Sequence, residues 1–454
     1  MRAQPPGPSG YPVVGNTYHY ARDPFSFMDA VRRAYGDVAR FTLGPVDAYM
    51  LSNPDDVERV LVTEEPTFRK ADFGDEAVHA LLGKGLLLSE GTFWEEQRRL
   101  AQPAFTMGRV SGLVETMAEK TAATLDEWTD GETMNVHLEL ARLTVEIIVE
   151  AMFGTEIDER TVRTVQDNLE PLGARFEPDP IRFLVPSWVP SAENREYYDA
   201  LSTLEGVVED LIERRRGTEA EGTDFLSILL RAQARGDQTD RQLRDEMMTM
   251  LLAGHDTTAL TLTYAFHQLG CHPEVERRLH EEVDRVLGDA QTSESARAGD
   301  ERLRPTMADL RDLEYTERVL KETMRLLPPV YTLFRQANAD VRVGGYRVPK
   351  DALVMLPQWV VHRDPAYWDD PETFDPDRWL PERSRDRHRY AYFPFGAGPR
   401  HCIGKQFSMV EAKVIASTIA GRFSLELVSD ADLSFRPSLT MHPRDPVEVR
   451  VHER

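Results

Sequence analysis

Cys402 stands in the segment whose residue types and spacing most favour chemistry, Phe395–Gly404, with the sequence FGAGPRHCIG. Two glycines and a proline predict a tight loop there rather than a helix or a strand. Helical apolar spacing follows over residues 403–423, so the cysteine is expected at the start of a helix. Free backbone N–H groups and the helix dipole at such a position stabilise a thiolate, which can bind a metal or attack a carbon atom.

That thiolate could serve in several ways. No second cysteine or histidine stands at zinc-ligand spacing, which disfavours a zinc site. A catalytic nucleophile would need a base from a distant histidine, and the spacing leaves this use open. Haem iron needs a single protein thiolate, on a loop that brings the backbone close to a flat macrocycle. A buried structural cysteine is the simplest alternative, and the ten-residue context favours a ligand over it.

The segment resembles the haem-ligand loop of the cytochrome P450 family, the haem-thiolate monooxygenases. That loop has Phe, then Gly, Arg or His, Cys and Gly at a fixed spacing, which this chain matches with Phe395, Gly398, Arg400, Cys402 and Gly404. The resemblance implies haem b as the cofactor, with Cys402 as the axial ligand of its iron. It further implies that Phe395 packs beside the sulfur and that Arg400 reaches a haem propionate.

A second motif lies in the apolar stretch Met247–His272, which contains AGHDTT at residues 253–258. Asp256 and Thr257 are unusual in the middle of a buried helix unless something polar binds there, and Gly254 would leave room for a flat ligand. The motif resembles the oxygen-binding kink of the family's central helix, so this acid and hydroxyl are expected to relay protons to dioxygen. The alternative is a threonine bonded back to its own helix and an aspartate capping a neighbour.

Further residues match the family's cofactor contacts and structural core. Trp94 and Arg98 are four apart, on one helix face, and match a pair that holds a propionate. Arg335, shortly after two prolines, matches another propionate contact, and Ala253 is expected beside the haem. The resemblance also implies a buried structural network made by Glu322, Arg325 and Arg378. Taken alone, a pair such as Glu322 and Arg325 is commonly a surface ion pair that contributes little.

The elements that must position these residues are mostly helices. The chain is expected to be mainly α with a smaller β-rich portion (α+β), a cytochrome P450 fold with haem between the central helix and the cysteine loop. Short strands are predicted over 37–52 and 340–356 around glycine- and proline-containing turns. No repeat or change in composition marks a linker, so residues 1–454 are expected to form a single haem domain without a fused reductase.

Composition excludes several other classes. The 454 residues are 41% hydrophobic and carry a formal net charge of −23, which excludes a disordered chain and argues against nucleic-acid binding. Two cysteines and no signal peptide or membrane anchor fit a cytoplasmic protein. Met247–His272 could span a bilayer, but its central Asp256 favours a buried helix. Only seven of the 54 basic residues are lysines, which suggests a halophile, such as a haloarchaeon, or an arginine-favouring genome.

The expected activity is the insertion of one oxygen atom of O2 into a C–H bond of an apolar small molecule, such as a fatty acid or a terpenoid. Electrons would come from a separate ferredoxin or flavodoxin and its NAD(P)H-dependent reductase, and the enzyme would be a monomer. Substrate walls are expected from residues 73–88, 171–190 and 332–333 and from the central helix near Ala253. The alternative is a non-catalytic haem-thiolate sensor or electron carrier, against which the Asp256–Thr257 pair argues.

Overall fold

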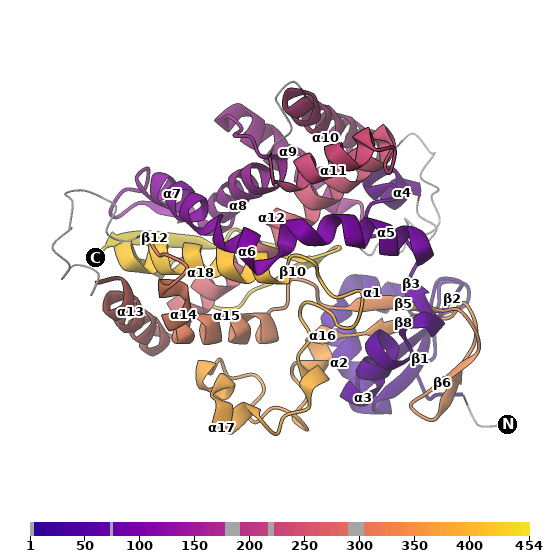
Figure 1. The fold of residues 1–454 in the computed structure, drawn as a ribbon. Helices are drawn as coiled ribbons and strands as arrows, with labels where there is room; N and C mark the ends of the chain where they lie inside the picture. Colours follow the sequence, from indigo (N-terminus) through magenta and orange to yellow (C-terminus); the bar gives the residue numbers. More distant parts are fainter. Residues whose placement is uncertain (1–3, 73–75, 178–190, 217–221, 289–303) are drawn as a thin grey trace.

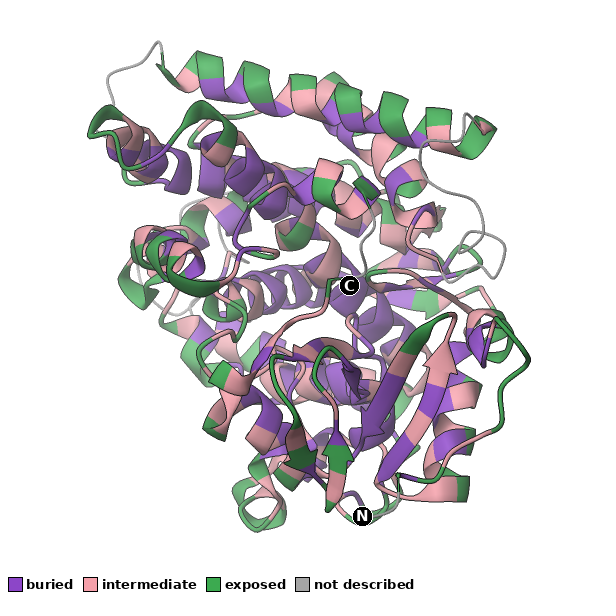
Figure 2. Cartoon of the chain, turned by 90° about the vertical axis from the view of Figure 1, so that its right-hand side faces the viewer, coloured by how far each residue is buried: buried purple, intermediate pink, exposed green. Residues whose placement is uncertain are grey.

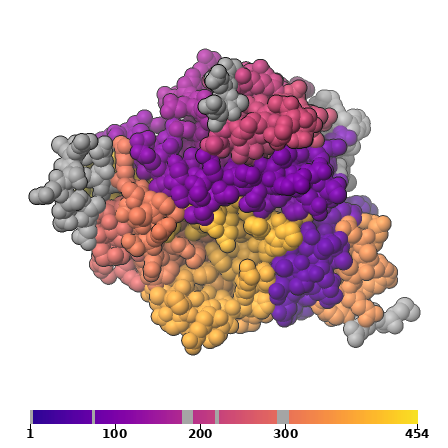
Figure 3. Space-filling view, in the orientation of Figure 1, coloured from indigo at the N-terminus to yellow at the C-terminus, as the bar shows by residue number. Residues whose placement is uncertain are grey.

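The computed structural model describes residues 4–72, 76–177, 191–216, 222–288 and 304–454. Helices form most of the molecule, and a smaller sheet-bearing part lies at one side (Figure 1). This confirms the expected mainly α fold with a smaller β portion. The helices at the centre are buried, whereas the outermost ones expose their outward faces (Figure 2). Figure 3 shows the C-terminal segments in yellow between the purple helices of the first third of the chain and orange segments below.

The helices have the following bounds: α1 (Thr17–Arg22), α2 (Pro24–Tyr35), α3 (Pro54–Glu58), the π-helix η1 (Arg59–Thr63), η2 (Glu65–Thr67), α4 (Glu76–Leu82), α5 (Gly91–Ala101), η3 (Gln102–Phe105), α6 (Met107–Ser111), α7 (Val114–Leu125), α8 (Val136–Phe153), α9 (Glu159–Ala174), α10 (Ala192–Arg216), α11 (Phe225–Ala234), α12 (Asp240–Cys271), α13 (Pro273–Gly288), α14 (Asp309–Asp312), α15 (Glu314–Leu326), α16 (Gln358–Val361), η7 (Pro376–Trp379), α17 (Pro381–Ser384), η8 (Arg389–Ala391) and α18 (Lys405–Arg422).

The main sheet has five strands in the order β1-β2-β8-β5-β3. Its β2–β8 pair is parallel and its other pairs are antiparallel. Smaller sheets pair β4-β12-β9, β6-β7 and β10-β11. The strands are β1 (Val38–Leu43), β2 (Val46–Leu51), β3 (Phe68–Lys70), β4 (Thr133–Asn135), β5 (Leu333–Ala337), β6 (Val341–Val343), β7 (Tyr346–Val348), β8 (Leu353–Leu356), β9 (Phe423–Leu427), β10 (Phe435–Pro437), β11 (Met441–Pro443) and β12 (Glu448–Glu453).

The central helix α12 organises the helical part. A capping box begins it, in which Thr239 accepts from the Gln242 backbone and the Gln242 side chain accepts from the Thr239 backbone. The helix packs against α8, α15 and α18 and is buried along most of its length. Within the described residues, no helix combines the length and the apolar character needed to cross a bilayer. The burial of α12 confirms the expectation of a buried helix over most of Met247–His272.

Candidate functional site

The cysteine loop is held in place by backbone hydrogen bonds and by two glycines. The Cys402 N–H donates to the Phe395 carbonyl at 2.8 Å, and φ is +66° at Gly396 and +67° at Gly398. A Cβ at Gly398 would lie 1.9 Å from the carbonyl oxygen of Leu61 in η1, so no larger residue fits. The loop is thereby fixed against η1 and delivers Cys402 two residues before Gly404, the N-cap of α18.

The Cys402 thiol is exposed to solvent and yet enclosed by protein. Burial raises the pKa of the thiol, while the backbone N–H groups of Gly404 and Lys405 and the charges of Arg98 and Lys405 act to lower it. The raised pKa corrects the expectation that the helix start alone stabilises a thiolate, because burial outweighs the amides. The sulfur is thus accessible and at the same time surrounded by protein, as a ligand for a buried group must be.

The middle of α12 has a second accessible surface. Ala253 is exposed, although residues 247–251 and 258–265 are buried. A Cβ at Gly254 would lie 2.7 Å from the side chain of Ile148, so Gly254 allows close approach of α8 and does not make room for a flat ligand as expected. On α12 the Thr258 hydroxyl lies 3.0 Å from the Ser408 hydroxyl of α18. This contact joins the two helices close to Ala253 and to the cysteine loop.

Asp256 and Thr257 follow Ala253 on the same helix. Asp256 Oδ2 accepts from the Thr440 hydroxyl at 2.8 Å and lies 3.4 Å from His442 Nε2. Burial acts to raise the pKa of Asp256, but His442, His255 and the Thr440 hydroxyl hold it below its usual value. The Thr257 hydroxyl lies 3.4 Å from the Ala253 carbonyl, a long bond that leaves it able to contact a ligand.

Two cations lie opposite each other on β3 and β5, and neither side chain is bonded to a carboxylate of the described residues. Arg335 is 8% exposed, its Nε has no hydrogen-bond partner among the described residues, and another nitrogen donates to the Phe334 carbonyl at 2.8 Å. Burial and the nearby Arg400 lower the pKa of Arg335 to about 10. Lys70 pairs with Arg335 in the strand register, and burial with these two arginines lowers the pKa of its ammonium to about 7. Lys70 donates only to backbone carbonyl groups, at 2.8 and 2.5 Å.

Arg400 differs from these two cations because it has acidic partners. It donates to Glu65 at 3.0 Å, to Glu90 at 2.5 Å and to the Ser89 carbonyl at 3.1 Å. Its guanidinium lies 4.3 Å from the ring centroid of Trp94, which is 8% exposed. The structure therefore neutralises the arginine that was expected to bind a propionate.

Arg98 lies on α5, the helix that also carries Trp94. It donates to the His401 carbonyl at 3.0 Å and lies 3.3 Å from the His401 ring nitrogen Nε2. Its charge acts to lower the pKa of the Cys402 thiol. The arginine thus ties α5 to the cysteine loop. Its partner in that loop is His401.

These residues fit a haem. The site offers one accessible thiol, an exposed Ala253 on the adjoining helix, and a buried guanidinium with an unpartnered N–H. A buried cation without a counter-charge is costly, and an anionic group such as a propionate would relieve that cost.

The sequence analysis did not predict four residues of this region, because no local motif marks them: Lys70, Glu65, Glu90 and Thr440.

Glu322 is the centre of a buried network beside these elements. On α15, it binds Arg325 through both carboxylate oxygens at 2.9 and 2.8 Å, and neither side chain is exposed. It also accepts from Arg378 and from Trp379, each at 3.0 Å. Arg325 further donates to the carbonyl of His362 at 3.0 Å. This is the arrangement that the family resemblance implied, and its role in stability stays a prediction.

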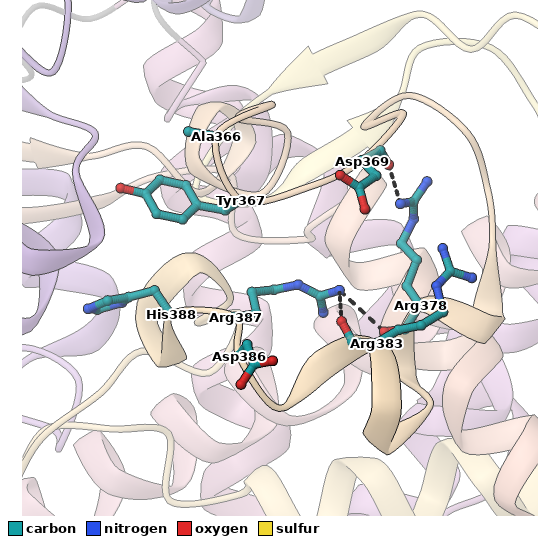
Figure 4. Close-up of a pocket in the computed structure, with 8 residues that line it drawn as sticks. All are labelled: Ala366, Tyr367, Asp369, Arg378, Arg383, Asp386, Arg387 and His388. Atoms are coloured by element: carbon teal, nitrogen blue, oxygen red, sulfur yellow. Dashed lines mark hydrogen bonds between the residues drawn. The ribbon is translucent and has the colours of Figure 1, made fainter.

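A pocket of about 400 Å³ lies in the segment that carries Arg378 and contains none of the expected haem contacts (Figure 4). Its arginines already bind protein: Arg387 donates to the carbonyls of Arg378 and Arg383 at 3.3 and 3.4 Å and lies 3.9 Å from the Trp368 ring centroid. Eight residues line it: Ala366, Tyr367, Asp369, Arg378, Arg383, Asp386, Arg387 and His388.

Comparisons with known proteins agree with this site. The family model "Cytochrome P450" matches residues 5–450. Cyclooctatin synthase of Streptomyces melanosporofaciens is 36% identical, over 96% of this chain and 92% of its own length. Pentalenene oxygenase of Streptomyces avermitilis is 31% identical, over 96% and 95%. The solved structure of retinoic acid bound cyanobacterial CYP120A1 has a TM-score of 0.86 at 24% identity, covers all of both chains, and shows the same fold.

Another relative is named cyclooctat-9-en-7-ol 5-monooxygenase, from Streptomyces melanosporofaciens, and is 35% identical over 94% of this chain and 90% of its own length. Because the family model covers nearly the whole sequence and these relatives are named for oxygenation, the chain belongs to the cytochrome P450 family of haem enzymes and is a monooxygenase.

Proposed function

We propose that this protein uses haem b to insert one oxygen atom of O2 into a C–H bond of an apolar terpenoid or fatty acid. A ferredoxin or flavodoxin with its NAD(P)H-dependent reductase supplies the electrons. The enzyme acts as a cytoplasmic monomer with a single haem domain over residues 1–454. The observation that carries this proposal is the Cys402 thiol, which is accessible but enclosed by protein just before α18, a helix that packs against α12.

In this proposal each residue of the site has a defined task. Cys402 ligates the iron, and Arg335 and Lys70 bind the propionates. When bound, the haem supplies the reductive activation of O2. Asp256 and Thr257 hold and move the protons that this activation consumes. The remaining expected contacts pack against the haem or hold the cysteine loop: Trp94, Arg98, Ala253, Phe395, Arg400 and Gly404.

Support for an apolar substrate comes from the relatives. Two of them are named for an alkene, pentalenene, and for an unsaturated alcohol, cyclooctat-9-en-7-ol. Of the expected substrate walls, Leu81 and Leu82 are 2% and 3% exposed and belong to the hydrophobic core. Residues 73–75 and 178–190, which include Phe183 and Leu184, lie outside the described residues. The oxygenase names of the relatives also disfavour the alternative of a sensor or electron carrier.

The test is the absorbance difference spectrum of the reduced protein with and without carbon monoxide. The wild type is expected to show the strongly red-shifted Soret band of thiolate-ligated haem. Cys402→Ser should lose this band, whereas Cys271→Ser, which changes the chain's other cysteine at the end of α12, should keep it. A red-shifted band that survives in Cys402→Ser would overturn the assignment of the ligand.

Substrate class is tested on the same protein by the spin-state shift of the ferric enzyme. Pentalenene and dodecanoic acid serve as the two probes. A shift with either probe supports an apolar substrate of that class. The absence of a shift with both would contradict the substrate proposal and leave the haem assignment intact.

A further inference from the structure

The carboxylate of Asp256 is bound by two residues of the β10–β11 hairpin, far along the chain: Thr440 in its turn and His442 on β11. The Thr440 hydroxyl bridges two groups, because it lies 2.8 Å from Asp256 Oδ2 and 2.9 Å from His442 Nε2. The direct separation of His442 Nε2 and Asp256 Oδ2 is 3.4 Å, longer than a good hydrogen bond. The hydroxyl is therefore the shorter path between the imidazole and the carboxylate.

The number of protons fixes the direction of this path. A threonine hydroxyl carries a single proton, and an ionised carboxylate can only accept. Since Thr440 donates to Asp256, its oxygen must accept from His442, which requires the proton on Nε2 of the imidazole. Donation thus runs in one direction, from His442 through Thr440 to Asp256.

The charges around His442 identify Asp256 as its main partner. Burial and Arg436 act to lower the pKa of His442, while Asp256, by its charge and hydrogen bond, and Glu177 raise it, so the pKa is raised. Arg436 on β10 is itself paired with Glu170 at 2.8 Å. The groups facing the cluster come from α12, α8, β10 and the end of α9: Asp256, His255, Tyr264, His137, Arg436 and Glu177.

The pKa values of two other imidazoles near His442 are shifted in the opposite direction. Burial lowers the pKa of His137 to about 4 and also lowers the pKa of His255. The His137 ring lies edge-on to His442, with 5.8 Å between the centroids, and its Nδ1 is 3.2 Å from the Thr263 hydroxyl. His442 is therefore the imidazole of the cluster whose pKa is raised, whereas the pKa values of His137 and His255 are lowered.

We propose that His442, acting through Thr440, both orients the carboxylate of Asp256 and loads it with a proton. The inference rests on the proposed role of Asp256 as a proton carrier for the oxygenation. The imidazolium proton passes from Nε2 to the Thr440 oxygen as the Thr440 proton passes to Asp256 Oδ2. A neutral imidazole and a neutral carboxyl result. Because the surroundings raise the pKa of His442 and lower that of Asp256, this neutral pair is transient and is drawn forward as Asp256 passes its proton on to the oxygenation; water then reprotonates His442. The side chains of His442 and Asp256 are 24% and 23% exposed, which gives water access to both ends.

The first test measures the pKa of His442 without turnover. Histidine labelled with carbon-13 is titrated by NMR in the diamagnetic ferrous carbon monoxide complex, and the signal is assigned with His442→Gln. Asp256→Asn is expected to lower the pKa of His442 by about one unit or more, because burial then acts without the opposing carboxylate. The exposed His452, which lies 3.0 Å from Glu426 and far from the cluster in sequence, provides the control signal. An unchanged pKa of His442 would overturn the pairing.

The second test measures product formed per NAD(P)H consumed, with a surrogate ferredoxin and reductase and whichever probe shifts the spin state. His442→Gln and Thr440→Val should each lower this ratio about a hundredfold, at the low end of what proton transfer by a side chain contributes. Thr440→Ser should restore it. In the wild type the ratio should decline above the measured pKa of His442, and His442→Gln should lack that decline.

One variant separates charge from proton transfer. His442→Arg keeps a positive charge but cannot release a proton, so it should be as uncoupled as His442→Gln. Full coupling in His442→Arg would overturn the proton transfer. The exposed control His452→Gln should leave the ratio unchanged. If these variants keep the red-shifted carbon monoxide band and wild-type coupling, this inference fails while the proposed function stands; loss of the band in the wild type would defeat the proposed function itself.

Discussion

Arg335 differs from the other buried arginines of the site because no carboxylate among the described residues forms an ion pair with it. Arg325 and Arg378 share Glu322, and Arg400 is held between Glu65 and Glu90. Burial of a guanidinium without an acidic partner has a desolvation cost that no protein contact offsets. Its unpartnered Nε therefore points to an anionic ligand group, and the haem propionates are the acids that this family's cofactor offers.

At the residue scale we predict that Arg335→Ala accelerates haem loss. Loss of a hydrogen bond to a charged group costs about 1.5–3 kcal/mol, which corresponds to about a 10- to 100-fold faster transfer of haem to excess apomyoglobin. The control is Arg347→Ala, which removes an exposed arginine paired with Asp340 on the small β6-β7 sheet. Equal transfer rates for Arg335→Ala and the wild type would show that Arg335 does not hold the haem.

At the scale of elements, Glu322 joins α15 to η7 and to the irregular segment before it. Five donors converge on its carboxylate: two from Arg325, one each from Arg378 and Trp379, and the backbone N–H of Asp375. Because both arginines are almost fully buried, they depend on this single negative charge. The network thus stabilises an irregular chain segment that has little regular secondary structure of its own.

We predict that Glu322→Gln is strongly destabilising. Removing one partner of a buried ion pair costs about 3–5 kcal/mol, because it leaves the other charge uncompensated, so urea denaturation should show a loss of that order. Glu317→Gln is the matched control on the same helix, since its half-exposed side chain pairs with Lys321 and Lys413. It should cost about 1 kcal/mol or less. A similar loss for both variants would contradict the special role of Glu322.

At the scale of the whole molecule, the surface carries a large excess of negative charge. The net charge of −23 remains although many arginines pair with acids, as in the exposed pair Arg163–Glu159. Exposed pairs contribute little each, whereas repulsion among the unpaired carboxylates acts over the whole surface. Salt weakens both effects, because the Debye length falls from about 10 Å at 0.1 M to about 3 Å at 1 M.

We predict that the melting temperature rises by several degrees between about 0.1 M and 2 M KCl, since screening relieves net repulsion more than it weakens exposed pairs. Differential scanning calorimetry of the holoenzyme measures this. Sucrose at matched osmolality serves as the control for effects that do not depend on charge. A flat or falling melting temperature would contradict the halophilic interpretation and favour an arginine-rich genome with an ordinary acidic surface.

The amino-acid sequence by itself determined the features that depend on near neighbours. The spacing of Phe395, Gly398 and Cys402 predicted a loop followed by a helix, because glycine and apolar periodicity act over a few residues. The same local rules predicted the strands around Gly44 and Gly344. They also predicted a buried central helix, since an aspartate in the middle of an apolar stretch is costly in lipid.

Only the tertiary structure decided which distant residues meet. Asp256 binds Thr440, 184 positions along the chain, and Lys70 lies opposite Arg335 in a sheet register. Gly254 allows α8 to pack closely against α12. Burial outweighed the helix start in setting the pKa of Cys402. In each case the outcome depends on which surfaces pack together and how much water they exclude, and local sequence preferences do not encode either.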